Sequence, residues 1–507
     1  MNYISLKNIR SLKDTGKIEL APLTVLLGKN SSGKSTFLRM FPLFKQSWNN
    51  KNMGALALYG DFVDFGDFNL LKTTGAKSRV IEIGFDIEVF SGEMPPRMRI
   101  SGNDKKQVIY QCVFGIRPLK NSDILHCPLI KIKSKDVSVL IRVSQSGKPL
   151  DVVINRFSYK TFLKDLNCLP ISTVFPSFVD AQESGRRRPP FFYPMPFTAP
   201  LEKRLGLKTM VERFDLFHLK NMLTFAPKQT FINHLSAESF GEFGKILSKS
   251  LKSESGDACY NDLLFAALPH FLDMLGQRLC SLGRNIYYSK PLRANAERYY
   301  RIQSLATEEI APDGSNLISF ISNMGSAKSD FDEWTKNNLG FIVYIHKEQG
   351  HQSIFLREDG AEYNVTDMGF GFSQMIPILV QLWDISKKQQ TPSIFRSNEF
   401  IYAVEQPELH LHPALQAKVV KLFCDVLKIA EKNKIKLRII LETHSETIVN
   451  YLGKLVAAKM IEENKVRLLI FEKAASSHTT SITESTYTKD GVLQNWPFGF
   501  FSTRNEI

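Results

Sequence analysis

The stretch that decides the fold is Gly28-Lys29-Asn30-Ser31-Ser32-Gly33-Lys34-Ser35-Thr36. It matches G-x-x-x-x-G-K-[ST], a loop whose backbone N–H groups cradle phosphates. The apolar run at 23–27 is typical of a buried strand, and residues 37–41 are typical of the start of a helix. Because strand, loop and helix follow in the order that phosphate binding needs, we predict a nucleoside triphosphate site rather than a chance match. Lys34 is expected at the β- and γ-phosphates and the Ser35 hydroxyl on Mg²⁺.

Composition sets looser bounds. The chain has 507 residues, of which 43% are hydrophobic and 23% charged, so it can form several domains or one domain with a large insertion. The net charge of +14 permits an anionic partner such as nucleic acid without identifying one. Six scattered cysteines without a C-x-x-C pair predict reduced thiols. With no signal pattern and no run of 18 apolar residues, we expect a cytoplasmic protein that does not span a membrane.

The pattern along the chain predicts a split domain. Residues 1–95 and 286–507 alternate strand-like and helix-like segments, whereas 96–285 begins with β-like runs and becomes helical after about 205. A long apolar helix is expected near 263–275, with Pro269 bending or dividing it. We therefore predict an α/β head with a mixed sheet and flanking helices, built from both ends of the chain and interrupted by a mostly helical insertion. Buried strands are expected at 400–404, 437–441 and 466–471.

Three further elements indicate the class of phosphate site. The strand at 400–404 ends in Glu405, an acid that can hold Mg²⁺ directly or through water. The strand at 437–441 ends in Glu442-Thr443-His444, a polar tip suited to sensing a γ-phosphate. A second glycine-containing turn, at 369–374, opens a helix and forms a second candidate anion cradle. Two cradles in one chain suggest a two-fold dimer in which each subunit closes the other's site.

The order of these motifs resembles the ABC/SMC-type ATPases, in the branch of stand-alone prokaryotic ATPases. Residues 287–293, 313–316 and 496–501 resemble that branch too, and the layout is similar to the ATPase of Septu-type antiphage systems, which also occurs with retrons. The resemblance implies ATP and Mg²⁺ as cofactors. It makes residues 28–36 the ATP-binding loop, Ser35 and Glu405 the metal side, and His444 a switch histidine. It assigns the signature loop that acts in trans to Gly369, Gly371, Ser373 and Gln374.

One position departs from the ABC pattern. The residue after Glu405, usually a carboxylate that polarises the attacking water, is Gln406. An amide can orient water but accepts no proton, and general-base help is worth a factor of about 10²–10⁴. Either Glu408 or His444 substitutes, or the protein is an ATPase with slow turnover whose useful state is the ATP-bound dimer. Gln406, Glu408 and His444 are therefore the candidate catalytic residues.

Other motifs have simpler interpretations. His410 and His412 lie two residues apart, as a metal pair can, but packing is the favoured explanation because no third ligand is near in sequence. His126 and Cys127 are adjacent and are interpreted as structural. The segment 186–194 joins three arginines to aromatic residues, which is typical of single-stranded nucleic-acid binding or of a solvated proline-rich loop.

Two functions of different class follow. The first is an antiphage defence subunit that senses nucleic acid and controls a separate nuclease of the HNH type. Its partners would be a second copy of the chain, or a higher even assembly, and in a retron the reverse transcriptase with its RNA/DNA product. The alternative is a self-contained ATPase-nuclease of the overcoming-lysogenisation type or a DNA-repair ATPase. The nuclease of that type uses clustered carboxylates with an Asp-x-Asp, which the last 60 or so residues lack.

Overall fold

The computed structural model describes residues 1–49, 54–90, 107–169, 174–180, 195–207, 227–229, 232, 241–302, 307–389, 397–473 and 479–497. The chain folds into two compact units. The antiparallel unit comprises 1–19, 43–284 and 392–397, and the P-loop unit comprises 20–42, 285–391 and 398–507. Among the described helices, none combines the length and hydropathy that a membrane crossing requires.

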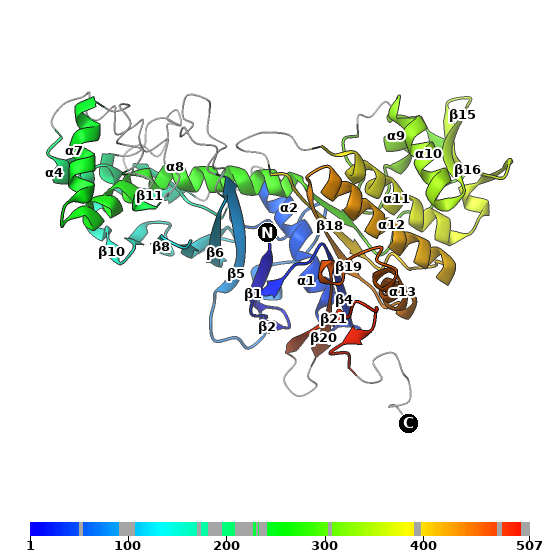
Figure 1. The fold of residues 1–507 in the computed structure, drawn as a ribbon, viewed down its shortest axis with the longest axis horizontal. Coiled ribbons are helices and arrows are strands. Elements are labelled where there is room, and N and C mark those ends of the chain that lie inside the picture. Colours follow the sequence, from blue (N-terminus) through cyan, green and yellow to red (C-terminus); the bar gives the residue numbers. More distant parts are fainter. Residues whose placement is uncertain are drawn as a thin grey trace. The chain divides into compact units, whose positions relative to one another are not determined.

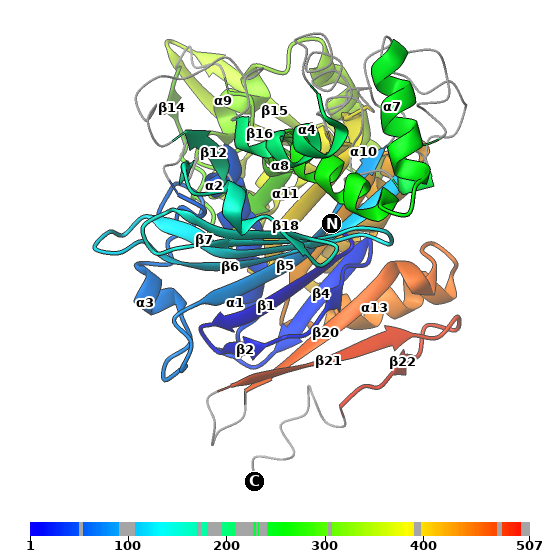
Figure 2. The same cartoon turned by 90° about the vertical axis from the view of Figure 1, so that its left-hand side faces the viewer.

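The antiparallel unit is built on one large sheet, which Figure 2 shows. Its strands follow the order β10-β9-β8-β7-β6-β5-β1-β2, and β3 pairs with β1. Their bounds are β1 Tyr3–Ile9, β2 Leu12–Asp14, β3 Ile18–Glu19, β5 Ile81–Phe90, β6 Gln107–Pro118, β7 Leu125–Lys133, β8 Ser138–Val143, β9 Pro149–Ile154 and β10 Phe157–Ser158. A separate pair joins β11 (Leu166–Leu169) to β12 (Ser177–Asp180).

Helices complete this unit. They are α3 Phe68–Leu71, α4 Ala199–Leu205, α7 Gly241–Lys252 and α8 Gly256–Arg284. The expected apolar helix is α8, which continues through Pro269 and is not divided there. Its inner face is aromatic: the Phe271 ring meets Tyr110 of β6 edge-on, and Phe265 stacks on Tyr159 with 4.1 Å between ring centroids. These contacts hold α8 against the sheet.

The structure differs in one respect from the expected division of the chain. In the described part of 96–285, strands extend through Asp180 and only the residues from Ala199 onward are helical. Among the described residues, α-helices therefore occur only in the second half of the insertion, in agreement with the expected change from β-like to helical segments, and "mostly helical" does not describe the first half. Its strand β6 pairs antiparallel with β5 along the whole of β5, and β5 pairs in turn with β1. Because backbone ladders join these strands, the N-terminal strands belong to the sheet of the insertion rather than to the sheet of the P-loop.

The P-loop unit is built on a seven-stranded mixed sheet in the order β13-β18-β19-β4-β20-β21-β22, visible in Figure 1. The first five strands are parallel and the last two antiparallel. Their bounds are β4 Leu23–Gly28, β13 Ile286–Ser289, β18 Glu399–Glu405, β19 Lys436–Glu442, β20 Val466–Lys473, β21 Thr480–Tyr487 and β22 Leu493–Gln494. The three expected strands at 400–404, 437–441 and 466–471 are confirmed. Every residue of β4 and β18 is buried, as parallel strands covered on both faces require.

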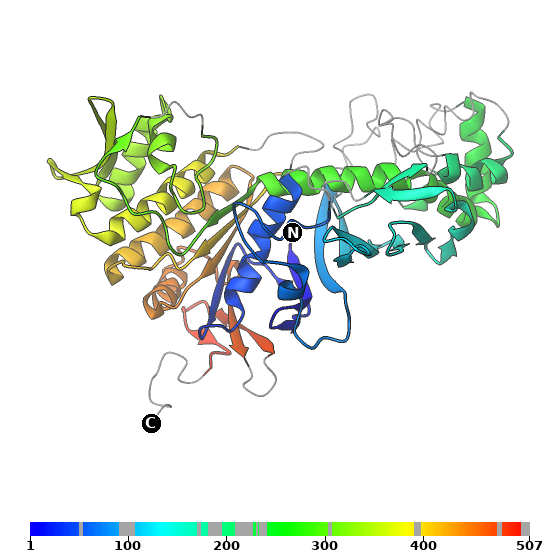
Figure 3. The same cartoon turned by 180° about the vertical axis from the view of Figure 1, so that it is seen from behind.

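Helices cover both faces of this sheet, so the predicted α/β class with flanking helices is confirmed. In Figures 1 and 3, α1 lies on one side of the strands and α12 and α13 on the other. The helices of this unit are α1 Lys34–Leu38, α9 Leu317–Ser322, α10 Ala327–Leu339, α11 Phe370–Lys387, α12 Pro413–Lys432 and α13 Glu446–Ala457. Helix α2, Met40–Asn49, begins in this unit, and its residues from Leu43 onward belong to the antiparallel unit. A smaller sheet contains β14 Tyr300–Arg301, β15 Ile342–Glu348, β16 His351–Glu358 and β17 Ala361–Asn364.

Candidate active site

The P-loop lies between β4 and α1, as the sequence predicts. Gly28 ends β4 with φ of 149°, and a Cβ there would lie 2.3 Å from the Phe471 carbonyl oxygen of β20, so only glycine fits. The Lys34 ammonium is buried and donates to the Gly28 and Lys29 carbonyls at 2.8 and 2.9 Å. Burial lowers the pKa of Lys34, and the nearby Glu442 opposes that shift. The lysine is thus held inside the loop by carbonyl oxygens that a phosphate oxygen can replace.

The acid that touches the P-loop is Glu442, at the end of β19. Its Oε1 accepts a 2.8 Å hydrogen bond from the Ser35 hydroxyl. Its Oε2 is buried without a hydrogen-bond partner in the described chain. Burial, and then the charge of Glu405, raise the pKa of Glu442 to about 7. A buried carboxylate oxygen beside the P-loop hydroxyl is the chemistry that a divalent cation takes.

Glu405, the acid expected beside Ser35, lies one strand away. It pairs in register with Glu442 across β18 and β19. Its two carboxylate oxygens accept from Nε and Nη2 of Arg39 at 2.7 and 2.8 Å, and Oε1 also accepts from the Tyr288 hydroxyl at 2.7 Å. Glu405 is therefore at the predicted end of the sheet but is tied to Arg39, while Glu442 holds Ser35. The sequence predicts Glu442 only as part of the polar tip. Its place at the end of an apolar strand marks it as a candidate acid, whereas its contact with Ser35 depends on β19 lying next to β4.

The three candidate catalytic residues lie at the same edge of the sheet. Gln406 has φ of 44° and donates its backbone N–H to the Glu442 carbonyl at 2.8 Å, so the chain turns sharply directly after the acid strand. Glu408 accepts at Oε1 from the backbone N–H of His444 at 2.8 Å, and its Oε2 is buried without a partner among the described residues. Burial raises the pKa of Glu408, as suits a proton acceptor. Burial and the charge of Lys34 lower the pKa of His444.

The signature segment is linked to this edge within the same chain. Gln374, which is 1% exposed on α11, accepts from the Arg293 backbone N–H and donates to the Arg293 carbonyl, both at 3.0 Å. The Arg293 guanidinium is buried and donates from Nη2 to the Glu405 carbonyl at 2.9 Å, and burial lowers its pKa to about 10. Gln374 and Arg293 therefore connect the signature helix to the acid strand, a connection that sequence spacing did not reveal.

The other signature residues surround the start of α11. Gly369 has φ of 86°, and a Cβ at Gly371 would lie 2.6 Å from the His410 carbonyl oxygen, so the turn packs directly on the segment after β18. Ser373 donates its hydroxyl to the Phe370 carbonyl at 2.8 Å. Phe370 is 43% exposed and meets the His410 ring edge-on.

The motifs given simpler interpretations can now be placed. His412 accepts from the Ala414 N–H and caps α12, and His410 packs on Phe370. In the described chain no group of three His, Cys, Asp or Glu side chains is arranged to hold a metal. His126 and Cys127 are both buried. The segment 186–194 lies outside the described residues.

The sequence matches the family described as "AAA ATPase domain" over residues 1–149 and 283–449, more than half of the chain. The chain belongs to this family. With its complete P-loop and the adjoining acids, it is a P-loop ATPase. Comparison with curated proteins found no match.

Two solved structures are similar. The first is the SMC head domain of Pyrococcus furiosus with an extended coiled coil, bound to the C-terminal domain of ScpA, at 11% identity and a TM-score of 0.35, with 96% of each chain covered. The second is the SMC head domain of Thermotoga maritima, at 9% identity and a TM-score of 0.33, with 95% of this chain and 98% of that chain covered.

Proposed function

We propose that this ATPase is the ATP-binding, slowly hydrolysing subunit of a cytoplasmic antiphage defence system of the ABC/SMC type. In this proposal it senses nucleic acid and controls a separate nuclease. The observation that carries the enzymatic part is the edge of the P-loop sheet, where a complete P-loop meets two acids and an amide follows the acid strand. The defence role rests on the motif resemblance to Septu-type ATPases and on the net positive charge of the chain.

Nucleotide binding follows from Lys34 and Ser35. A phosphate oxygen that takes the place of the Gly28 and Lys29 carbonyls gives the buried Lys34 ammonium an anionic partner. The residues also fit Mg²⁺. The Glu442 Oε2, which has no partner in the described chain, and the Ser35 hydroxyl are oxygen ligands of the kind that this ion takes. Glu405 lies beside Glu442 on the neighbouring strand. When bound, the ion neutralises charge that develops on the β- and γ-phosphate oxygens.

Slow turnover follows from Gln406. The amide can orient a water but cannot take its proton, so the next carboxylate along this segment, Glu408, is the candidate proton acceptor. Its Oε2 is buried and unpartnered in the described chain and its pKa is raised, while its Oε1 is occupied by the His444 N–H. Glu408 therefore has one free carboxylate oxygen and lies two residues beyond the position of the usual catalytic carboxylate. We expect it to activate water poorly.

The assembly is a homodimer or a higher even oligomer with ATP between subunits. The half-exposed Phe370 and the glycine turn around it form the surface that would close on the partner's nucleotide. Lys34→Ala and Ser373→Ala proteins should each be inactive alone. Mixing them creates heterodimers with one intact composite site, so about a quarter of wild-type ATPase activity should return at equal concentrations if exchange is random. No recovery after confirmed subunit exchange would exclude a site completed in trans.

The proposed role also requires partner molecules. We expect a co-encoded HNH-type nuclease and, in a retron, the reverse transcriptase with its RNA/DNA product. Purified full-length chain with Mg²⁺-ATP should bind single-stranded DNA or RNA and retain that nuclease in gel filtration, and should leave plasmid DNA intact when alone. Plasmid cleavage by the chain alone would favour the self-contained nuclease, whereas a permease gene beside this one would favour a transporter ATPase.

A further inference from the structure

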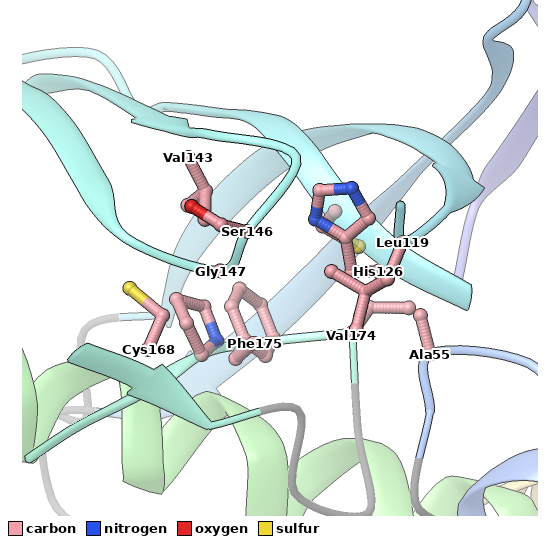
Figure 4. A pocket seen from close by; sticks show the side chains of 11 residues that line it. Ala55, Leu119, His126, Val143, Ser146, Gly147, Cys168, Val174 and Phe175 are labelled. Atoms are coloured by element: carbon pink, nitrogen blue, oxygen red, sulfur yellow. The ribbon is translucent and has the colours of Figure 1, made fainter. Parts of the chain in front are cut away.

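A cavity of about 250 Å³ lies in the antiparallel unit, and none of the residues assigned to ATP is among those that line it. Figure 4 shows it between the imidazole of His126 on one side and Ser146 and Cys168 on the other. The β6–β7 and β8–β9 segments and the strand pair β11–β12 bring its walls together. They are lined by Ala55, Leu119, His126, Cys127, Val143, Ser146, Gly147, Cys168, Val174, Phe175 and Pro176.

His126 is the unusual member of this lining. It lies on β7 and is 5% exposed, yet neither ring nitrogen has a hydrogen-bond partner among the described residues. Burial, and then the charge of Arg117, lower the pKa of His126 to about 4, so the ring is neutral near pH 7. A neutral imidazole offers one donor and one acceptor, and leaving both unmade in a buried place is unfavourable. The cavity supplies room for the missing partner.

The other walls define what that partner can be. Among the described residues, the lining contains no Lys, Arg, Asp or Glu, so the cavity wall itself offers no ion-pair partner to a charged ligand such as a nucleotide phosphate. Arg117, which pairs with His126 across β6 and β7, is the cation that acts on His126 but does not belong to this lining. Burial raises the pKa of the Cys127 and Cys168 thiols, which therefore stay protonated and apolar. A water molecule needs two to four polar partners, and among the described lining side chains these are His126 and the exposed Ser146 alone. The site therefore favours an apolar body over water.

We propose that this cavity binds a small uncharged molecule with a one- or two-ring apolar body and a single hydroxyl or amide that hydrogen-bonds to His126. The cavity is smaller than the sites of about 300–1,000 Å³ that typically bind drug-sized ligands, so its volume suits a molecule smaller than a drug. Phe175 is buried and fixed edge-on against Phe114, with 5.2 Å between centroids, so it offers a rigid ring to pack against. This site is independent of the proposed ATPase function.

Ligand-observed NMR on the full-length protein tests the site with three probes of similar size: phenol, toluene and benzoate. Phenol should bind, toluene should bind roughly five-fold more weakly because it lacks the hydrogen bond, and benzoate should not compete. Equal binding of phenol and benzoate would overturn the uncharged-ligand assignment. Absence of phenol binding would overturn the site itself.

Variants locate the binding. Val143→Phe should fill the cavity and abolish binding of phenol and toluene, whereas His126→Phe should abolish the preference for phenol over toluene. Leu150→Ala, at an exposed residue of the same sheet, should leave all three affinities unchanged. Circular dichroism checks that each variant is folded. If His126→Phe does not fold, the Val143→Phe result decides, and phenol binding that survives in folded Val143→Phe protein would refute the proposal.

Discussion

Replacing Gln374 by leucine is expected to destabilise the P-loop unit strongly although the side-chain volume hardly changes. The carboxamide is 1% exposed and makes two 3.0 Å hydrogen bonds, one to the Arg293 N–H and one to the Arg293 carbonyl. Leucine can make neither. Both Arg293 backbone groups would then be buried without partners, in a place that water does not reach.

The magnitude follows from those two groups. Each buried backbone group left without a partner costs about 1–3 kcal/mol, so the loss of two partners should lower the free energy of unfolding by about 2–6 kcal/mol. Gln381 provides a matched control, because it lies on the same helix α11 and is 4% exposed. Within the described chain the Gln381 carboxamide makes no hydrogen bond, so Gln381→Leu should cost clearly less.

Urea unfolding followed by tryptophan fluorescence measures the difference. Three of the four tryptophans, Trp334, Trp383 and Trp496, lie in the P-loop unit, and Trp383 is on α11 itself. The Gln374→Leu midpoint should fall well below those of wild type and Gln381→Leu. If the two leucine variants lose the same stability, the two hydrogen bonds do not hold Arg293 and the link between α11 and the acid strand is refuted.

Four other predictions follow from the site and from the cavity. Lys34→Ala should abolish ATP binding in equilibrium dialysis, and retained affinity would remove the lysine from the phosphate site. Gln406→Glu should raise the steady-state ATPase rate, by up to about 10²-fold, if the missing carboxylate limits turnover; an unchanged rate points to Glu408 or to product release. Tyr288→Phe should lower the free energy of unfolding by about 1.5–3 kcal/mol, because the buried Glu405 loses a charge-assisted hydrogen bond, and a thermal melt at neutral pH checks this. Folding lowers the pKa of His126 from 6.5 to about 4, so the contribution of the neutral imidazole to the free energy of unfolding is fully present above pH 6.5. This contribution is lost as pH falls towards 4, by about 3 kcal/mol in total. If the pH profile of wild-type stability ran parallel to that of His126→Phe, the shift would be contradicted.

The local elements of the ATPase can be predicted from short stretches of the sequence. The glycines, Lys34 and Ser35 have a fixed spacing in one short loop, so the sequence alone predicts that they bind phosphate. The strands β18, β19 and β20 are largely continuous apolar runs because both of their faces are covered. Such runs also allow the strands to be predicted from the sequence. That Glu405 and the polar tip at 442–444 share one edge also follows, since the ends of parallel strands meet there.

Which acid contacts the P-loop depends on how distant segments pack. Ser35 and Glu442 are 407 positions apart, and their contact depends on β19 lying next to β4 while β18 lies one strand further out. Strand order is set by packing and backbone ladders between distant segments, which residue types at a strand end do not encode. The same holds for β1 and β5, which look like part of the P-loop sheet in sequence but pair into the sheet of the insertion. It holds equally for Arg293 and Gln374, whose two hydrogen bonds join buried polar groups that lie 81 positions apart in the sequence.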